Sequence, residues 1–229
     1  MRGRARRLVD AAGFELLGGL VVLFAAAWAF GAVAEGVSEG EPAIDSRLAA
    51  WLHGHATPAL TSFFKTVTFF GNFASLLVVS AVAVLVLLRR GQRTEATLVV
   101  LAFGGAQILT LGLKLGFQRE RPFFPDPLAT APTTYSFPSG HACVSAAVYG
   151  AIGYILARHL PGARAKLLAL AVTAVVILLI GFSRLYLGVH FLTDVVAGFC
   201  LGIAWVALCV VALNLRVRLR FRPAEAGKQ

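Results

Sequence analysis

Two residues near the carboxyl end of the sequence have the spacing of a catalytic pair. His190 and Asp194 stand four positions apart, so on a helix they lie on one face. The carboxylate can accept the Nδ1 proton of the imidazole, which leaves the Nε2 lone pair free as a nucleophile. Lone His–Asp pairs are more often structural or metal-binding, but three cations, Lys114, Arg121 and Arg184, accompany this pair. They would repel a metal ion, so we expect an anion.

The charges of these residues favour a phosphoryl group. Lys114, Arg121 and Arg184 are cations, and Asp194 is the one anion among them. A phosphate monoester brings a charge of about −2 at neutral pH, so the bound site would be near neutral. No cluster of Asp and Glu suggests a Mg²⁺ site. We therefore expect chemistry without a metal or other cofactor.

A second polar cluster, Ser139-Gly140-His141, opens an apolar run. Ser is a preferred helix cap, Gly lets the backbone approach a ligand, and a helix start with free N–H groups binds anions. An ordinary capped helix would explain Ser139 and Gly140 alone. His141 favours the anion site, because an imidazole there can give a proton to a leaving group.

A third cluster contains Lys114 and Arg121, seven positions apart. Both project on one face if a single helix carries them, and Pro122 is expected to end that helix at Arg121. The alternative is that both side chains merely extend to the membrane interface.

Membrane-spanning helices must position these clusters. The chain has 229 residues, of which 58% are hydrophobic and only 14% charged, and its mean hydropathy is +0.79. A soluble domain carries about a quarter charged residues, so the bilayer is the expected solvent. The apolar runs predict an all-α, polytopic membrane protein, a single domain over residues 1–229 with six transmembrane helices. These helices are expected at Phe14–Ala34, Asn72–Leu88, Thr94–Phe117, His141–Ala157, Ala165–Leu187 and His190–Leu213.

Lys and Arg are distributed unevenly between the two sides that these spans define. With both termini in the cytoplasm, fifteen of the 21 Lys and Arg residues lie on the cytoplasmic side. This positive-inside pattern predicts a multi-pass protein of the plasma (bacterial inner) membrane. The net charge of +10 then reflects topology and does not indicate a nucleic-acid partner. All three polar clusters fall at the other, extracytoplasmic ends of the spans.

The first span and the loop after it carry weaker signals. Ala32-Val33-Ala34 resembles a signal-peptide cleavage site, but the apolar stretch before it is longer than a usual signal region. Residues 35–71 form an extracytoplasmic loop with one short amphipathic helix that ends at Pro58. Its expected cap is Asp45 or Ser46, and its apolar face is Leu48, Trp51 and Leu52. We expect this helix to lie in the headgroup region, with a lipid-entry gate as the alternative.

The three clusters together resemble the signature of the type 2 phosphatidic acid phosphatase (PAP2) superfamily, in its membrane lipid phosphatase branch. The motifs of that family read KxxxxxxRP, PSGH and SRxxxxxHxxxD, and the resemblance covers residues 114–194 of this chain. It implies a PAP2/haloperoxidase-like helical bundle. Every fixed position is present: Lys114, Arg121, Pro122, Pro138, Ser139, Gly140, His141, Ser183, Arg184, His190 and Asp194.

The resemblance also implies a two-step mechanism through a phosphohistidine. His190 would attack phosphorus in line while His141 protonates the departing lipid oxygen, and water would then cleave the phosphohistidine. Asp194 would orient His190. The equatorial phosphoryl oxygens would be held by Lys114, Arg121, Ser139, Gly140 and Arg184.

We therefore expect a phosphatase for lipid-linked phosphates at the extracytoplasmic membrane face. Candidate substrates are undecaprenyl diphosphate, phosphatidylglycerophosphate and phosphatidic acid, with recycling of the lipid carrier as the first choice. A lipid phosphotransferase that uses the same phosphohistidine is an alternative. A vanadate-dependent haloperoxidase and a non-catalytic lipid-binding or transport protein are the others. The sequence specifies neither the lipid nor the oligomeric state.

Overall fold

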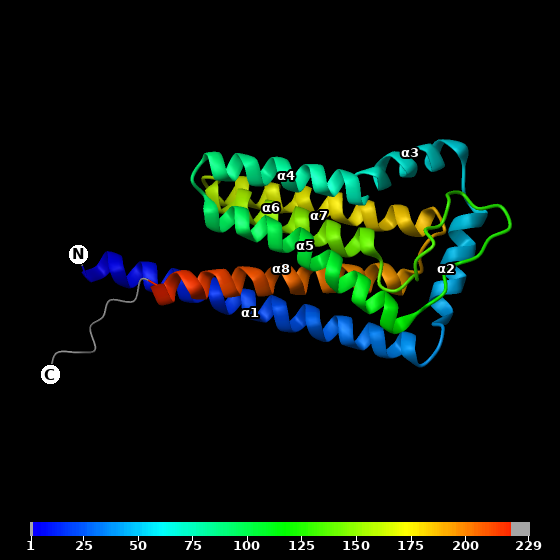
Figure 1. Ribbon diagram of the computed structural model, residues 1–229, viewed down its shortest axis with the longest axis horizontal. Coiled ribbons are helices and arrows are strands. Elements are labelled where there is room, and N and C mark those ends of the chain that lie inside the picture. Colours follow the sequence, from blue (N-terminus) through cyan, green and yellow to red (C-terminus); the bar gives the residue numbers. More distant parts are fainter. Residues whose placement is uncertain (1, 221–229) are drawn as a thin grey trace.

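The computed structural model describes the backbone of residues 2–220 and the side chains of residues 16–216. Every regular element in this part of the chain is an α-helix (Figure 1). The helices are α1 (Arg2–Ser38), α2 (Ala43–Gly54), α3 (Pro58–Phe69), α4 (Phe73–Arg89), α5 (Arg93–Phe117), α6 (Gly140–His159), α7 (Ala163–Tyr186) and α8 (Leu192–Arg220).

Five of these helices, α1, α5, α6, α7 and α8, are long and apolar enough to cross a membrane. A sixth span results when α3 and α4 are taken together, since they meet at a bend of 45°. The prediction of six spans is consistent with this arrangement, and the five single-helix spans lie within about one helical turn of their expected positions. The remaining expected span, Asn72–Leu88, corresponds to α4 alone, and the prediction did not include α3. Large apolar side chains stand exposed on the outer helix faces, as lipid contact requires.

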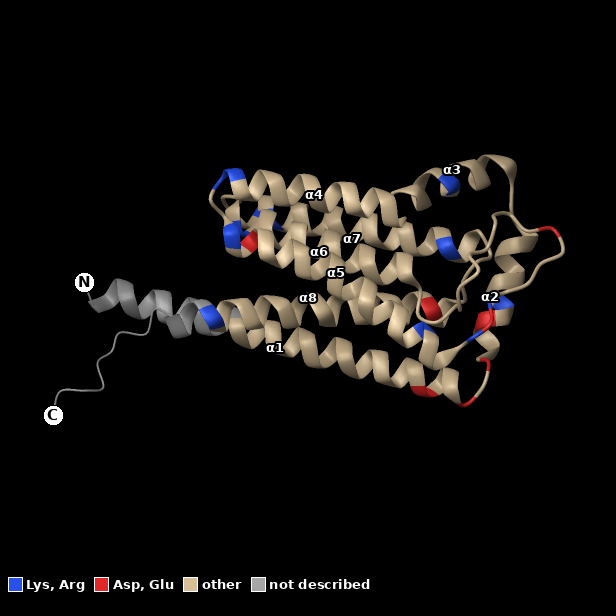
Figure 2. Ribbon diagram, in the orientation of Figure 1, with Lys and Arg blue, Asp and Glu red and all other residues tan. Residues whose placement is uncertain are grey.

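The bundle has two chemically different ends. The α4–α5 and α6–α7 connections lie at one end, where Lys and Arg gather (Figure 2). At the opposite end lie α2, α3 and the long segment 118–139 between α5 and α6 (Figure 1). The predicted basic side chains at positions 2–7 and 218–228 lie outside the described residues.

Helix α8 packs against α6 through two glycines four residues apart. A Cβ on Gly198 would lie 2.7 Å from the carbonyl oxygen of Ser139, and a Cβ on Gly202 would collide with that of Cys143. Only glycine permits so close an approach of the two backbones. This contact holds the start of α6 beside the start of α8, which is where two of the three motifs lie.

Residues 35–71, predicted as a loop with one short helix, contain α2 and also α3, the first half of the bent span. Helix α2 begins at Ala43, so Asp45 and Ser46 lie in its first turn, and the expected cap at either residue is wrong. Pro58 does not merely follow α2. It occupies the first turn of α3, where a missing backbone N–H costs nothing.

The buried face of α2 also differs from the prediction. Leu48 and Leu52 pack into the apolar contact with α7 and α8, whereas the side chain of Trp51 is 57% exposed. Trp51 therefore does not share a face with the two leucines. In its place Asp45 turns inward and is completely buried.

Candidate active site

His190 lies just before α8 and not inside it, because the helix begins at Leu192. Asp194 stands in the first turn, and its Oδ2 accepts the backbone N–H of Phe191 at 2.9 Å. This bond is the backward half of a capping box and fixes the carboxylate at the helix start. The same oxygen lies 3.2 Å from Nδ1 of His190. The two residues meet through capping geometry, and the predicted shared helical face is wrong.

The pair is shielded from solvent, with His190 3% exposed and Asp194 fully buried. Burial lowers the pKa of His190 to about 3, although the adjacent Asp194 carboxylate acts in the opposite direction. The imidazole is therefore neutral near pH 7. Because Nδ1 faces Asp194, the proton is assigned to Nδ1 and the lone pair to Nε2.

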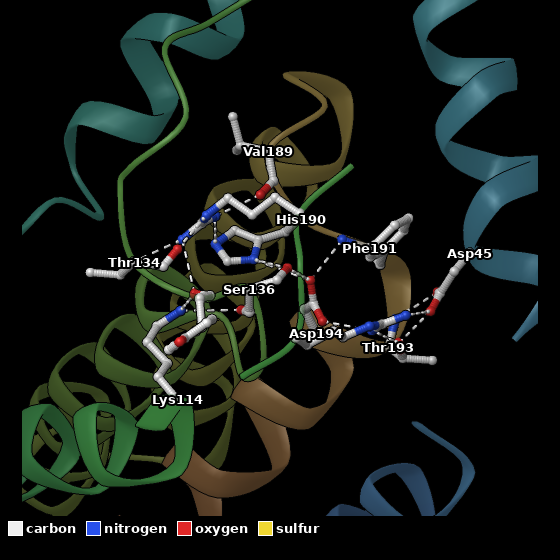
Figure 3. A network of polar contacts seen from close by, with 12 residues as sticks. Asp45, Lys114, Thr134, Ser136, Val189, His190, Phe191, Thr193 and Asp194 are labelled. Atoms are coloured by element: carbon white, nitrogen blue, oxygen red, sulfur yellow. Dashed lines mark hydrogen bonds and ion pairs between the residues drawn. The ribbon is translucent and has the colours of Figure 1, made fainter. Parts of the chain in front are cut away.

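Two further residues hold Asp194, and the sequence did not single out either of them. Ser136 donates its hydroxyl hydrogen to Oδ2 of Asp194, and Arg119 donates from NH1 to Oδ1 at 2.7 Å. The other terminal nitrogen of Arg119 donates to Asp45 on α2 at 2.8 Å. Figure 3 shows this network running from His190 through Asp194 to Asp45 on a separate helix. The available signals were modest: a serine beside the PSGH motif and an extra arginine within KxxxxxxRP.

Lys114 and Arg121 do not share a helix. Helix α5 ends at Phe117, and Gln118 adopts a left-handed conformation with φ of 48°, so the predicted continuation to Arg121 is wrong. The two cations nevertheless converge, because both donate to the carbonyl oxygen of Tyr135. Lys114 also donates to the carbonyl oxygen of Ser136 at 3.2 Å, and it is 8% exposed. Neither cation merely extends to an interface.

Arg121 forms the direct contact between the first and third motifs. Its NH1 lies 3.1 Å from Nε2 of His190 and donates to the carbonyl oxygen of Val189 at 2.7 Å. Its Nε donates to the carbonyl oxygen of Thr134 at 2.8 Å. Burial lowers the pKa of Arg121, but a guanidinium stays charged at physiological pH. A cation thus stands where the His190 lone pair points.

The PSGH segment presents polar groups that are free to bind a ligand. Ser139 is the N-cap of α6, as predicted, yet its hydroxyl caps no backbone N–H. Its Oγ is buried and has no hydrogen-bond partner among the described residues. A Cβ on Gly140 would make only an ordinary 3.5 Å contact with Thr110, so protein packing does not require glycine there. Thr110 is the one residue with an atom within 4 Å of that Cβ position among the described side chains.

His141 lies in the first turn of α6, half-buried, within range of the charges of Arg184, Arg121 and Lys114 and close to His190. The bend between α3 and α4 packs directly against it. A Cβ on Gly71 would lie 3.1 Å from Cδ2 of the His141 ring, so the backbone at the bend helps to place the imidazole.

Arg184 stands in the last turn of α7 and is 6% exposed. Its NH1 donates to Oγ1 of Thr68 on α3 at 2.7 Å. Its Nε is buried without a hydrogen-bond partner among the described residues. A buried cationic donor without an acceptor is costly, and an anionic ligand would supply the acceptor.

The structure therefore gathers the predicted residues of all three motifs at one end of the bundle. Arg121 contacts Nε2 of His190 and shares the carbonyl oxygen of Tyr135 with Lys114, and Arg119 adds a charge that Asp45 balances. Within the described side chains, no three His, Cys, Asp or Glu residues gather as a metal site would require. Chemically, the arrangement places a neutral imidazole with a free Nε2 lone pair beside cationic and hydroxyl donors, some of which have no acceptor among the described residues.

Sequence comparison assigns the family. The sequence model of the PAP2 superfamily matches residues 95–218, which is more than half of the chain and contains all three motifs. The chain belongs to the PAP2 superfamily. Phosphatidylglycerophosphatase B of Bacillus subtilis (strain 168) is 43% identical to this PAP2 chain over 110 residues, which are 48% of the chain and 53% of the relative. Undecaprenyl-diphosphatase of Sulfolobus acidocaldarius is 33% identical over 136 residues, 58% of the chain and 61% of the relative. The matches thus span only part of each relative's length.

Solved structures agree in fold. The crystal structure of a transmembrane PAP2-type phosphatidylglycerolphosphate phosphatase from Bacillus subtilis superposes with a TM-score of 0.74 at 29% identity. The match covers 89% of this PAP2 chain and 98% of that chain, so it extends beyond residues 95–218. Aquifex aeolicus LpxE has a TM-score of 0.60 at 23% identity, over 74% of this chain and 96% of its own, and supports the fold alone. The predicted all-α membrane fold is confirmed.

Proposed function

We propose that this PAP2 protein hydrolyses phosphate esters of membrane lipids through a covalent phosphohistidine on His190. One observation carries the proposal: Nε2 of a neutral, buried imidazole lies against the Arg121 guanidinium, and the same site holds two buried donors, Ser139 Oγ and Arg184 Nε, without a partner among the described residues. A phosphoryl group placed there accepts hydrogen bonds from Ser139 and Arg184 and offsets the positive charge. Its oxygens also reach the open backbone at Gly140.

In the first step, Nε2 of His190 attacks phosphorus and the bond between phosphorus and the lipid oxygen breaks. His141 donates a proton to that oxygen, so a lipid monophosphate leaves as an alcohol and a lipid diphosphate leaves as the lipid monophosphate. The phosphorylated imidazole carries a positive charge, which the Asp194 carboxylate at Nδ1 stabilises. Arg121 turns from Nε2 toward a phosphoryl oxygen as the substrate enters.

In the second step, water attacks phosphorus and the phosphorus–nitrogen bond breaks. His141 is neutral after the first step and takes the proton of that water, which restores its starting state. Negative charge builds on the equatorial oxygens in both steps, and fixed cations and N–H donors stabilise it. The groups that hold these oxygens are Lys114, Arg121, Ser139, Gly140 and Arg184.

The site is proposed to open at the extracytoplasmic face of the plasma membrane, with both termini in the cytoplasm. Support comes from the basic residues around the α4–α5 and α6–α7 connections, at the end of the bundle opposite the site (Figure 2). Cysteine accessibility tests this directly. A cysteine introduced at exposed Phe123 should react with a membrane-impermeant maleimide in intact cells, whereas one at Arg90 should react only after lysis.

For the substrate, the proposal is a lipid whose phosphate is terminal. The names of the two relatives direct attention to phosphatidylglycerophosphate and undecaprenyl diphosphate. Phosphatidic acid completes the set, because in-line attack by His190 requires only a lipid alkoxide that His141 can protonate.

The test is phosphate release by purified protein from these three lipids in detergent micelles. We expect release from at least one, retention of the rate in EDTA because side-chain cations supply the positive charge, and inhibition by vanadate as a phosphate analogue. Failure to release phosphate from any of the three would contradict the proposal. A strict requirement for added Mg²⁺ would contradict its mechanism.

A further inference from the structure

Asp45 belongs to none of the three motifs and has no role in the proposed two-step mechanism. It lies on α2, outside the matched residues 95–218, and is fully buried. A buried carboxylate is retained only where donors or a counter-charge stabilise it. Asp45 has both: the backbone N–H of Thr193 donates to Oδ1 at 3.0 Å, and the Thr193 hydroxyl donates to Oδ2. Its counter-charge is Arg119.

Arg119 bridges two buried carboxylates with its two terminal nitrogens. NH2 donates to Asp45 at 2.8 Å and NH1 to Asp194 at 2.7 Å, while the ring of Phe191 lies 4.4 Å from the guanidinium carbon. NH1 also donates to the Thr193 hydroxyl at 2.7 Å. Because the guanidinium is planar and held at both nitrogens, it cannot turn about its own axis.

This bridge acts on the carboxylate that orients the nucleophile. Arg119 binds Oδ1 of Asp194, whereas the contact with Nδ1 of His190 is made by Oδ2. With Oδ1 fixed, the carboxylate plane is fixed, and Oδ2 remains directed at the imidazole. Asp45 thus lies three contacts away from His190, with Arg119 and Asp194 between them, although Asp45 and His190 are far apart in the sequence.

We propose that Asp45 and Arg119 form a positioning pair, in which Asp45 holds Arg119 and Arg119 holds Asp194 so that His190 is presented for attack. The inference rests on the proposed function, because it concerns the same nucleophile. It gives α2 a specific role: this helix supplies the outermost member of a chain of contacts that ends at the reacting nitrogen.

The experiment is a double-mutant cycle on phosphate release from phosphatidylglycerophosphate, undecaprenyl diphosphate and phosphatidic acid. The variants are Asp45→Asn, Arg119→Gln and the double substitution. Asparagine retains an acceptor for the Thr193 N–H and removes the charge, so the fold is expected to persist. Each single variant should lower kcat and kcat/KM by about ten- to a hundredfold, as loss of an outer partner does elsewhere. KM should change by less than roughly twofold, because the lost interaction orients the nucleophile and does not bind substrate.

The cycle also tests the order of the contacts. If Asp45 acts through Arg119, then Asp45→Asn in the Arg119→Gln background should change the rate by less than about twofold. The matched control is Asp126→Asn, which removes another link between α2 and the segment 118–139, the exposed pair of Asp126 with His53 at 3.0 Å. That variant should retain the wild-type rate.

Several results would overturn the inference. The first is a wild-type rate for Asp45→Asn. The second is a double variant whose loss of rate equals the product of the losses in the two single variants. The third is a rise in KM of either single variant at unchanged kcat. Should Asp45→Asn not purify as a folded protein, Arg119→Lys replaces it, since lysine keeps the charge but cannot bridge both carboxylates. A wild-type rate for Arg119→Lys would also refute the pair. A wild-type protein that releases no phosphate from any of the three lipids would instead refute the proposed function, before any variant is measured.

Discussion

The two halves of the candidate site are built differently. The nucleophile half consists of His190, Asp194, Ser136, Arg119 and Asp45, and each side chain in it has a polar partner within the protein. The phosphate half consists of Ser139, Gly140, His141 and Arg184. It contains a buried hydroxyl and a buried guanidinium nitrogen that have no partner among the described residues.

This difference separates orientation from recognition. In the proposed mechanism the nucleophile half is already oriented before substrate arrives, and Arg121 is the group that must leave Nε2 before His190 attacks. The phosphate half keeps donors unsatisfied, and the ligand supplies the missing acceptors. Arg121 belongs to both halves in turn, because it contacts Nε2 of His190 now and must move to the phosphoryl oxygens when substrate binds.

The nucleophile half is broken most completely by His190→Ala. We expect phosphate release to fall by about 10⁴-fold or more, because no other group replaces the attacking nitrogen. The measurement is initial rate on the best lipid substrate, with thermal unfolding of both proteins as the folding check. His55→Ala is the control, since among the described residues this exposed imidazole has one hydrogen-bond partner, the carbonyl oxygen of Trp51. A rate for His190→Ala within tenfold of wild type would correspond to a rise in activation free energy of less than roughly 1.4 kcal/mol. That result would show that His190 is not the nucleophile.

Arg184→Lys tests the phosphate half, because lysine keeps the positive charge but lacks the planar guanidinium with its several N–H donors. We expect kcat/KM to drop by about 10²- to 10³-fold, the cost of removing a donor that stabilises transition-state charge. Vanadate should also inhibit this variant less strongly than wild type. Arg47→Lys, at an exposed position on α2, is the matched control. Unchanged vanadate inhibition in Arg184→Lys would show that Arg184 does not bind the phosphoryl group.

The pH dependence of stability tests the burial of His190 in the nucleophile half. Its pKa is lowered from the unfolded value of 6.5 to about 3, so the unfolded chain binds a proton that the folded protein does not. Stability due to this residue therefore falls as pH drops through 6.5 toward 3, by about 1.4 kcal/mol per pH unit. His190→Gln cannot take up that proton. When the pH is lowered from about 7 to about 5, the unfolding temperature of wild type should therefore fall relative to that of His190→Gln. A constant difference over that range would mean that His190 is not buried as a neutral base.

The smallest expected effect concerns the support of the phosphate half by α3. Thr68→Val removes the acceptor of Arg184 NH1 and preserves the shape of the side chain. We expect KM to rise by roughly fivefold with little change in kcat, in line with about 1 kcal/mol for one hydrogen bond. Thr66→Val is the control on the same helix, because the Thr66 hydroxyl bonds only to the carbonyl oxygen of Ser62. Equal kinetics for the two variants would show that Thr68 has no influence on Arg184.

Much of this architecture could be predicted from the sequence because its signals are local. Apolar runs of about twenty residues mark spans whether or not the helices pack together, so five spans were placed correctly, and the sixth was predicted without the α3 half of its bent pair. The three motifs could be recognised for the same reason, because the spacing of residues within each motif is a property of a short segment. The span that ends at Phe117 was predicted correctly, but the expected continuation of its helix to Arg121 was wrong, because Gln118 adopts a left-handed conformation that is more often marked by glycine.

The contacts of the nucleophile half could not be predicted from such local signals. Asp45 and Arg119 are 74 positions apart, and their ion pair exists only because α2 folds back onto α8. An acidic residue near the start of a short helix has an ordinary local explanation as a cap, and that explanation was wrong here. The exposed side chain of Trp51 has the same origin, since the face that α2 buries is decided by its neighbours and not by its own pattern.

The central claim is that phosphorus becomes bonded to His190 during turnover. The most direct measurement is rapid mixing of the protein with lipid phosphate, quenching in alkali where phosphohistidine survives, and mass spectrometry of the peptide that contains His190. The account predicts a phosphoryl group on His190 in wild type and none in His190→Ala. A phosphoryl group on another residue, or continued turnover with unmodified His190 at every time point, would contradict it.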